Sequence, residues 1–168
     1  MGKLAEQIHW IDWIGSGPVD LDTDRTCDYI NVANYRRGLV LFTDAAGTAG
    51  DDWNFTLKEA TSATGTGVQD CDIIDEYWLK QAATSLLSTP QFTRFTQTAD
   101  ALVDGNNTSA ERVCLLVLDL DFSRMSEGYN FLSATVTLDA SGGAQQGAVL
   151  LGLYDARYPQ TTLLGALS

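Results

Sequence analysis

The chain has 168 residues, and 10 Lys and Arg against 22 Asp and Glu give a formal net charge of −12 with the single His neutral. This length indicates one domain, and 45% hydrophobic residues supply a sizeable core, which excludes a disordered chain. We expect no nucleic-acid partner, because phosphate binding needs a Lys/Arg stripe, and no membrane partner, because no apolar run approaches ~20 residues.

The first predicted element lies near the N-terminus, where Leu4, Ile8 and Ile11 recur at helical spacing and favour a short helix. The N-terminus lacks the residue order of a signal peptide, so we expect synthesis in a cytoplasm. We expect residues 1–17 to form an N-terminal arm and residues 18–168 to form the main domain.

The same segment carries an unusual apolar motif. Ile8-His9-Trp10-Ile11-Asp12-Trp13-Ile14 places two Trp and three Ile in seven residues. These side chains leave a large exposed patch unless they pack on their own domain or on a neighbouring subunit, and both interpretations stay open. The candidate interface residues are therefore Ile8, Trp10, Trp13 and Ile14.

The rest of the chain has the pattern of short strands. Segments 36–42, 113–118 and 147–154 are apolar at both parities, which indicates strands covered on both faces. In segments 53–58 and 130–138, apolar residues alternate with polar ones, which is typical of half-buried strands with the polar set toward solvent.

Turns separate these strands. Gly- and Asp-rich loops occupy 45–52, 64–67, 104–108 and 139–143, and a single helical turn is expected at Phe122-Ser123-Arg124-Met125, capped by Asp121 and stopped by Gly128. A weaker strand is expected at 92–98. Together the segments give about seven or eight strands, with the spacing typical of an all-β domain. The fold class predicted is a β-sandwich or jelly roll.

Acidic residues form the only clusters that suggest chemistry. The two acidic strings lack the spacing of a calcium loop, so they are either solvated turn acids or weak cation sites. Asp119 and Asp121 share a strand face and could act as a glycosidase pair, or Asp121 could simply cap a turn. The two strings are Asp70, Asp72, Asp75 and Glu76, and Asp20, Asp22, Asp24 and Asp28.

Cysteine and histidine are too few for the commonest active sites. Cys27, Cys71 and Cys114 fit neither a disulfide framework nor a zinc knuckle, so buried or half-buried free thiols are expected. His9 alone is too little for a His-based zinc site or for a Ser-His-Asp relay with a second His. We therefore expect no catalytic residue, no metal ligand and no cofactor, and a protein that is not an enzyme.

Eight segments, spread from Pro18 to Tyr158, carry a resemblance to a known family. They are Pro18-Val19-Asp20-Leu21-Asp22-Thr23, Asp28-Tyr29-Ile30, Ala45-Ala46-Gly47-Thr48-Ala49-Gly50-Asp51-Asp52, Phe55-Thr56-Leu57-Lys58-Glu59-Ala60-Thr61, Gly65-Thr66-Gly67, Phe92-Thr93, Leu116-Val117-Leu118-Asp119, and Gly147 through Tyr158. Together these segments resemble the capsid decoration, or cement, proteins of tailed bacteriophages, small virion proteins encoded among the head genes. The resemblance implies a β-sandwich that binds the outer capsid surface as a homotrimer, with the major capsid protein as partner and the virion as its location.

Two other functions stay open. A carbohydrate-binding or tail-associated β-sandwich module would expose aromatic residues as sugar platforms, for example Trp53, Tyr77 and Trp78. An enzyme would need a concave pocket with perturbed carboxylates.

Overall fold

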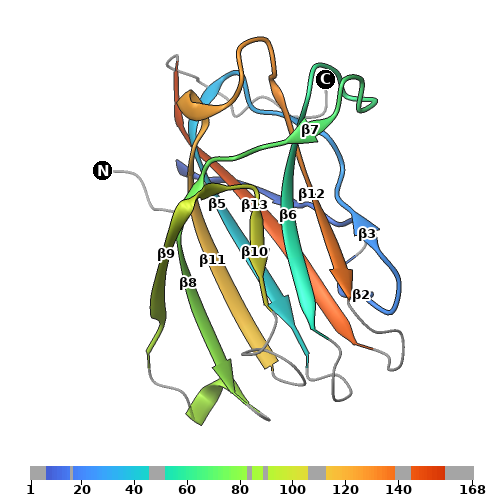
Figure 1. Cartoon of the computed structure of the whole chain (residues 1–168), viewed down its shortest axis with the longest axis vertical. Helices are drawn as coiled ribbons and strands as arrows, with labels where there is room; N and C mark the ends of the chain where they lie inside the picture. Colours follow the sequence, from blue (N-terminus) through green and yellow to red (C-terminus); the bar gives the residue numbers. More distant parts are fainter. Residues whose placement is uncertain are drawn as a thin grey trace.

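The computed structural model describes residues 7–15, 17–45, 52–82, 85–88, 91–105, 113–138 and 145–157. Within them, two antiparallel sheets form an all-β sandwich, which confirms the predicted fold class (Figure 1). No helix in these ranges is long and apolar enough to cross a membrane.

The first sheet has the order β1-β13-β5-β11-β8-β9, with β2 also paired to β13. The second has the order β10-β6-β12-β3, with β4 paired to β12 and β7 to β6. Two short 3₁₀ turns, η1 and η2, complete the described elements. Their bounds are β1 His9–Asp12, β2 Val19–Asp20, β3 Arg25–Thr26, β4 Ile30–Asn31, β5 Tyr35–Asp44, β6 Trp53–Ala60, β7 Gln69–Asp70, β8 Ile74–Ala82, η1 Leu86–Ser88, β9 Thr93–Asp100, β10 Leu102–Asp104, β11 Val113–Asp121, η2 Phe122–Arg124, β12 Phe131–Leu138 and β13 Gln146–Ala156.

The core lies between the two sheets and follows the predicted alternation. On β6, Trp53, Phe55 and Leu57 are fully buried, as the period of two predicts. The Phe42 ring of β5 meets the Trp53 ring edge-on, with ring centroids 5.0 Å apart, so the two sheets interlock through aromatic side chains.

The strands that are apolar at both parities form the middle of the first sheet. β5 lies between β13 and β11, and all three alternate buried residues with half-buried or exposed ones. Their buried residues belong to the core, whereas Leu39, Leu41 and Val117 do not pack against it. Among the described residues, these strands pack against the core with one face, and their second apolar face points outward.

The predicted N-terminal helix does not continue through Ile11: Gln7 is helical, but the chain is extended from His9 on. His9–Asp12 is strand β1, which pairs antiparallel with β13, and the backbone N–H of Trp13 donates to the Val149 carbonyl at 2.9 Å. Residues 9–13 are therefore part of the sandwich and not an arm outside it. Ile11 packs against the core from this strand.

The predicted single turn is confirmed at η2, Phe122–Arg124. The Asp121 carboxylate accepts a hydrogen bond from the Ser123 backbone N–H at 3.0 Å, as an N-cap residue does. Gly128 follows with φ +84°, a conformation that glycine adopts without strain. The loop expectations at 46–51, 106–108 and 139–143, and Tyr158 at the end of the resemblance, lie outside the described residues.

Ser133 on β12 is an exception to the period of two. The alternation predicts a solvent-facing hydroxyl, but Ser133 is fully buried, and its hydroxyl donates to the Cys27 carbonyl at 2.6 Å. The short strands β3 and β4 both pair with β12, and the segment between them supplies the carbonyl that this hydroxyl reaches. The segment that joins these two short strands includes Cys27.

Replacing Ser133 by Ala is expected to lower the free energy of unfolding by about 1–3 kcal/mol, because the buried Cys27 carbonyl loses its donor. Urea denaturation measures the change. Thr137→Ala, at a half-buried position of the same strand parity, is the control and should cost under about 1 kcal/mol. Equal losses in the two variants would contradict the role of this hydrogen bond.

Candidate interaction surface

One row of side chains crosses the outward side of the whole first sheet. The register places Asp12 of β1 opposite Leu150, Leu150 opposite Leu41, and Leu41 opposite Val117. The row continues from Val117 to Trp78 of β8 and from Trp78 to Arg94 of β9. Paired residues in antiparallel strands project from the same face, so this row is apolar in its middle and charged at both ends.

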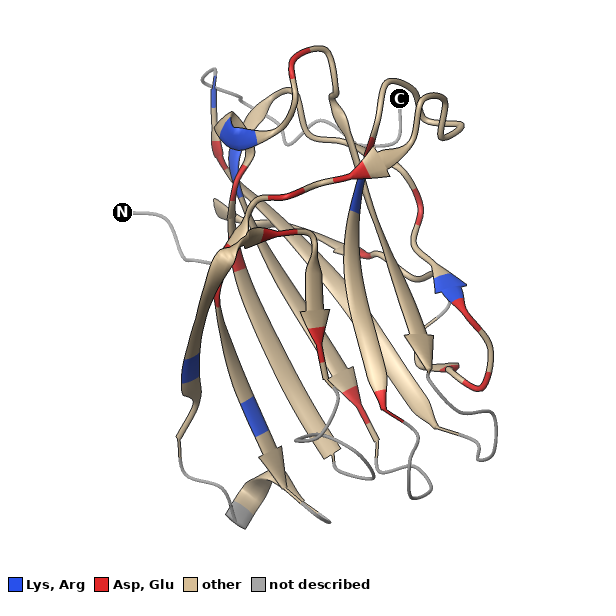
Figure 2. Cartoon of the chain, viewed as in Figure 1, with Lys and Arg blue, Asp and Glu red and all other residues tan. Residues whose placement is uncertain are grey.

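Neighbouring positions widen the apolar area. Leu115 lies beside this row on β11 and Leu39 beside it on β5, and neither contacts the core. Figure 2 shows that the acidic segments lie mainly in loops and near strand ends, and that the middle of β13, β5 and β11 is free of charge. On β8, Lys80 lies opposite Leu115 at the margin of this area. We call this surface the outer face, formed by Trp10, Leu39, Leu41, Trp78, Leu115, Val117 and Leu150.

The N-terminal motif contributes to both sides of the sheet. Trp10 is 40% exposed and lies over Gly152 of β13, where an added Cβ would come within 2.9 Å of the indole and 2.7 Å of Ile8. Ile8 is buried in this contact. Gly152 thus provides the space that lets Trp10 and Ile8 cover the outward side of β13.

The other two candidate interface residues face the core. Trp13 is fully buried, and its Nε1–H donates to the Asp28 carbonyl at 2.8 Å. Ile14 is half-buried and packs against the same core. Own-domain packing therefore holds for Trp13 and Ile14, and of the four candidates only Trp10 has a large exposed surface. An alternation with a period of two through β1 would have placed Trp10 and Trp13 on opposite faces, because strand residues three positions apart point to opposite faces.

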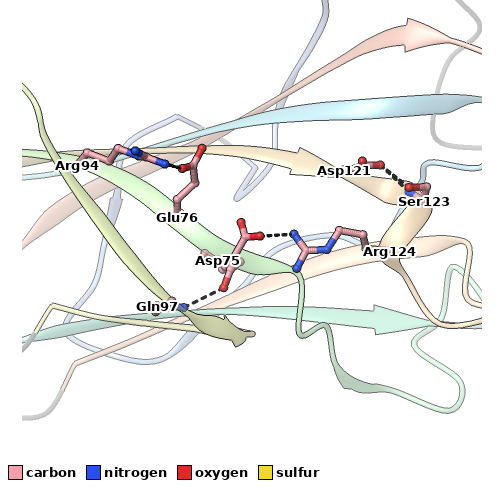
Figure 3. Close-up of polar contacts among 8 residues, drawn as sticks. Asp75, Glu76, Arg94, Gln97, Asp121, Ser123 and Arg124 are labelled. Atoms are coloured by element: carbon pink, nitrogen blue, oxygen red, sulfur yellow. Dashed lines mark hydrogen bonds and ion pairs between the residues drawn. The ribbon is translucent and has the colours of Figure 1, made fainter.

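The acidic string 70–76 is held by separate ion pairs. Asp75 binds Arg124 at 2.8 Å and Glu76 binds Arg94 (Figure 3), and Asp70 binds Lys58. The described residues contain no group of three or more potential metal ligands among His, Cys, Asp and Glu.

The proposed carboxylate pair on β11 is also divided between two structural roles. Asp119 binds Arg37 at 2.8 Å and accepts a hydrogen bond from the Tyr154 hydroxyl at 2.6 Å. Asp121 caps η2 (Figure 3), and its hydrogen bonds from Ser123 lower the pKa of its carboxyl. A glycosidase acid needs a raised pKa, so this pair does not have that arrangement.

A polar hollow of about 630 Å³ lies beside this pair. Arg37 holds its charge firmly there, because hydrogen bonds to Asp119 and Tyr154 raise the pKa of its guanidinium. Asp155 takes a positive φ of 53°, which is uncommon for a residue other than glycine. The hollow is lined by Arg36, Arg37, Asp121, Ser123, Asp155 and Arg157.

The expected sugar platform is not assembled. Trp53 is fully buried, and Tyr77 stacks on Phe95 with ring centroids 5.1 Å apart while both pack against the core. Trp78 alone of the three lies on the outer face. These aromatic residues therefore do not share an exposed surface.

The three cysteines are free and buried, as the sequence predicts. Burial raises the pKa of the Cys27 and Cys71 thiols, and nearby carboxylates raise both further. Burial also raises the pKa of Cys114. All three stay protonated and are therefore poor nucleophiles.

A buried acid, which the sequence analysis did not single out, lies at the end of β5. Asp44 is 1% exposed and accepts a hydrogen bond from the fully buried Gln145 amide. Burial raises the pKa of Asp44 to about 7, although bonds from Gln145 and the Ala45 amide partly oppose the shift. One oxygen of each side chain, Oδ1 of Asp44 and Oε1 of Gln145, has no hydrogen-bond partner. Asp44 occupies an inward-facing position in the alternation of β5, and this was the sequence signal that could have predicted its burial.

Comparison with protein-family models and with curated proteins gives no match. Among solved structures, the insecticidal delta-endotoxin Cry8Ea1 from Bacillus thuringiensis is similar with TM-score 0.35 and 12% identity, covering 81% of this chain and 19% of that one. The coat protein of Tobacco streak virus is similar with TM-score 0.19 and 15% identity, covering 96% of this chain and 94% of that one. At these TM-scores neither similarity bears on what this chain does.

Proposed function

We propose that this chain is a non-enzymatic virion structural protein that decorates the outer surface of a phage head and stabilises the shell. The resemblance to decoration proteins supplies the partner, the major capsid protein. The observation that carries the proposal is the outer face. Antiparallel sheets commonly place polar residues on the side away from the core, whereas here leucine, valine and tryptophan occupy it.

A continuous apolar surface of this kind marks a contact with another macromolecule. Leu150 and Trp10, each 40% exposed, are the most accessible members of the outer face. Burying them against protein removes apolar area from water, which stabilises the complex. The proposal therefore assigns the outer face to contacts between protein subunits.

Binding of this kind stabilises a shell without chemistry. A homo-oligomer that contacts several capsid subunits gains avidity, because its second and later contacts are intramolecular. A protein that binds the expanded lattice and not its disassembled subunits shifts the equilibrium toward the intact shell. The net charge of −12 suits a protein on the outside of the shell, away from the packaged DNA.

The test uses two leucines of nearly equal exposure on opposite sheets. Leu150 on the outer face is 40% exposed, and Leu102 on β10 of the second sheet is 38% exposed. We expect Leu150→Lys to weaken binding to expanded phage heads that lack the protein by about tenfold or more, the value of one buried leucine. Leu102→Lys should bind as the unchanged protein does.

Co-sedimentation of the fluorescently labelled protein with heads measures both variants. Absence of binding to heads by the unchanged protein would overturn the proposal, and binding to isolated tails instead would favour the tail-associated alternative. Equal binding by the Leu150→Lys and Leu102→Lys variants would show that the outer face is not the contact.

A further inference from the structure

We infer that the outer face is covered by a second copy of this chain, in a two-fold arrangement whose axis runs parallel to the strands. The inference rests on the part of the proposed function that assigns this face to protein contacts. It identifies the partner on this face as a second copy, in a dimer that takes the place of the trimer implied by the resemblance. Leu150→Lys then weakens head binding because the dimer, and with it the avidity for the head, is lost.

The two ends of the central row carry opposite charges. Asp12 on the edge strand β1 is exposed, and Arg94 on the opposite edge strand β9 has a side chain 60% exposed. Five strand spacings of about 4.8 Å separate them, so the charges lie roughly 24 Å apart across the sheet. Between them the row contains only Leu150, Leu41, Val117 and Trp78.

This order is self-complementary for only one kind of two-fold packing. Two copies that meet face to face are related by an axis in the plane between them, and the same patch is then used twice. An axis along the row would place Asp12 against Asp12 and Arg94 against Arg94. An axis parallel to the strands reverses the row, so that Asp12 of each copy lies opposite Arg94 of the other.

The apolar middle fits the same orientation. Reversal of the row places Leu41 opposite the partner's Val117 and Leu150 opposite the partner's Trp78, so an aliphatic side chain meets an indole on both sides of the axis. Side chains of different size interdigitate better than a tryptophan facing a tryptophan. Aligned sheet packing of this kind is the same arrangement that forms the interior of a β-sandwich.

Both terminal charges are held in place within their own chain. Asp12 accepts a hydrogen bond from the Gly17 backbone N–H at 2.7 Å through one oxygen, and Arg94 pairs with Glu76 on the adjacent strand. A guanidinium has five N–H donors and a carboxylate accepts several bonds, so each group keeps capacity for a partner across the interface. Their fixed positions lower the entropy cost of that contact.

The experiment is a charge exchange, measured by sedimentation equilibrium over a range of protein concentrations. All variants carry Glu76→Gln, so that an acid at position 94 is not repelled within its own chain. We expect the protein with Glu76→Gln alone to form a dimer. Adding Asp12→Lys or Arg94→Glu singly should weaken dimerisation at least about tenfold, since like charges then face each other twice. The double variant should return to within about threefold of the background.

Asp70→Lys, a charge reversal on β7 of the second sheet, is the matched control and should leave the dimer unchanged. Thermal melting of each variant checks that the fold is intact. The inference would be overturned if the double variant dimerised as weakly as the combined effects of the two single variants predict. A trimer, or a monomer at every concentration, would overturn it as well.

Head binding separates this inference from the proposed function. A monomer whose binding to heads is still weakened by Leu150→Lys contradicts the two-fold pairing and leaves the decoration role supported. A dimer that obeys the charge exchange and does not bind heads supports the pairing and contradicts the decoration role.

Discussion

Replacing Trp13 by alanine is expected to lower the free energy of unfolding by about 3–5 kcal/mol, the range for large aromatic residues removed from a core. Trp13 is fully buried, and its indole N–H donates to the Asp28 carbonyl at 2.8 Å. The loss combines a cavity between the sheets with an unpaired carbonyl. Urea denaturation followed by far-UV circular dichroism measures it.

Trp10→Ala is the matched comparison within the same motif. Trp10 is 40% exposed and lies over Gly152, so its removal should cost under about 2 kcal/mol. Trp13→Phe, which keeps most of the packing and loses the hydrogen bond, should cost about 1–2 kcal/mol and remains measurable where Trp13→Ala does not fold. Similar losses for Trp10→Ala and Trp13→Ala would contradict the assignment of Trp13 to the core.

Asp44→Asn is expected to increase stability at pH 8 by up to about 4 kcal/mol. Burial raises the pKa of Asp44 from 3.8 to about 7 in the folded chain, and each pKa unit corresponds to about 1.4 kcal/mol. The buried carboxylate at pH 8 is the costly form, because it has lost its hydration. An amide of the same shape carries no charge and avoids this cost.

The direction of the pH dependence follows from the raised pKa. Between pH 4 and 7 the folded chain holds a proton on Asp44 that the unfolded chain has released, so stability falls as pH rises through this window. The contribution is complete below pH 4 and lost above pH 7. The difference in stability between the unchanged protein and the Asn variant therefore grows from near zero at pH 4 to its maximum near pH 8.

Urea unfolding at a series of pH values measures this difference. Asp72→Asn, which changes an exposed carboxylate, is the control and should change stability by under about 0.5 kcal/mol at pH 8. An Asp44→Asn variant that is less stable than the unchanged protein at pH 8 would show that the carboxylate of Asp44 is stabilised by its surroundings.

Strand positions and their inward faces could be predicted from the sequence because alternation at a period of two is a local property. Trp53, Phe55 and Leu57 required no knowledge of the rest of the chain. The cap of η2 by Asp121 is local for the same reason, since donor and acceptor are two residues apart. The burial of Ser133 was not predictable, because its hydroxyl bonds to the Cys27 carbonyl, 106 residues away in the chain.

The N-terminal motif shows how a short segment misleads when its secondary structure is read incorrectly. Residues three apart share one side of a helix and take opposite faces of a strand. A helix through this segment would place Trp10 and Trp13 on one side, whereas β1 directs Trp13 into the core and Trp10 outward. Pairing with β13, more than 130 residues later in the chain, decides between the two.

The sequence by itself determined the fold class, the positions of six of the thirteen described strands, and the presence of strands that are apolar on both sides. Only the tertiary structure decided which of those sides is the core and which carries no second layer among the described residues. The physical reason is register: the row from Asp12 to Arg94 joins six strands that are distant in the chain. Hydrogen bonding between strands, and not any local pattern, places an acid and an arginine at opposite ends of that row.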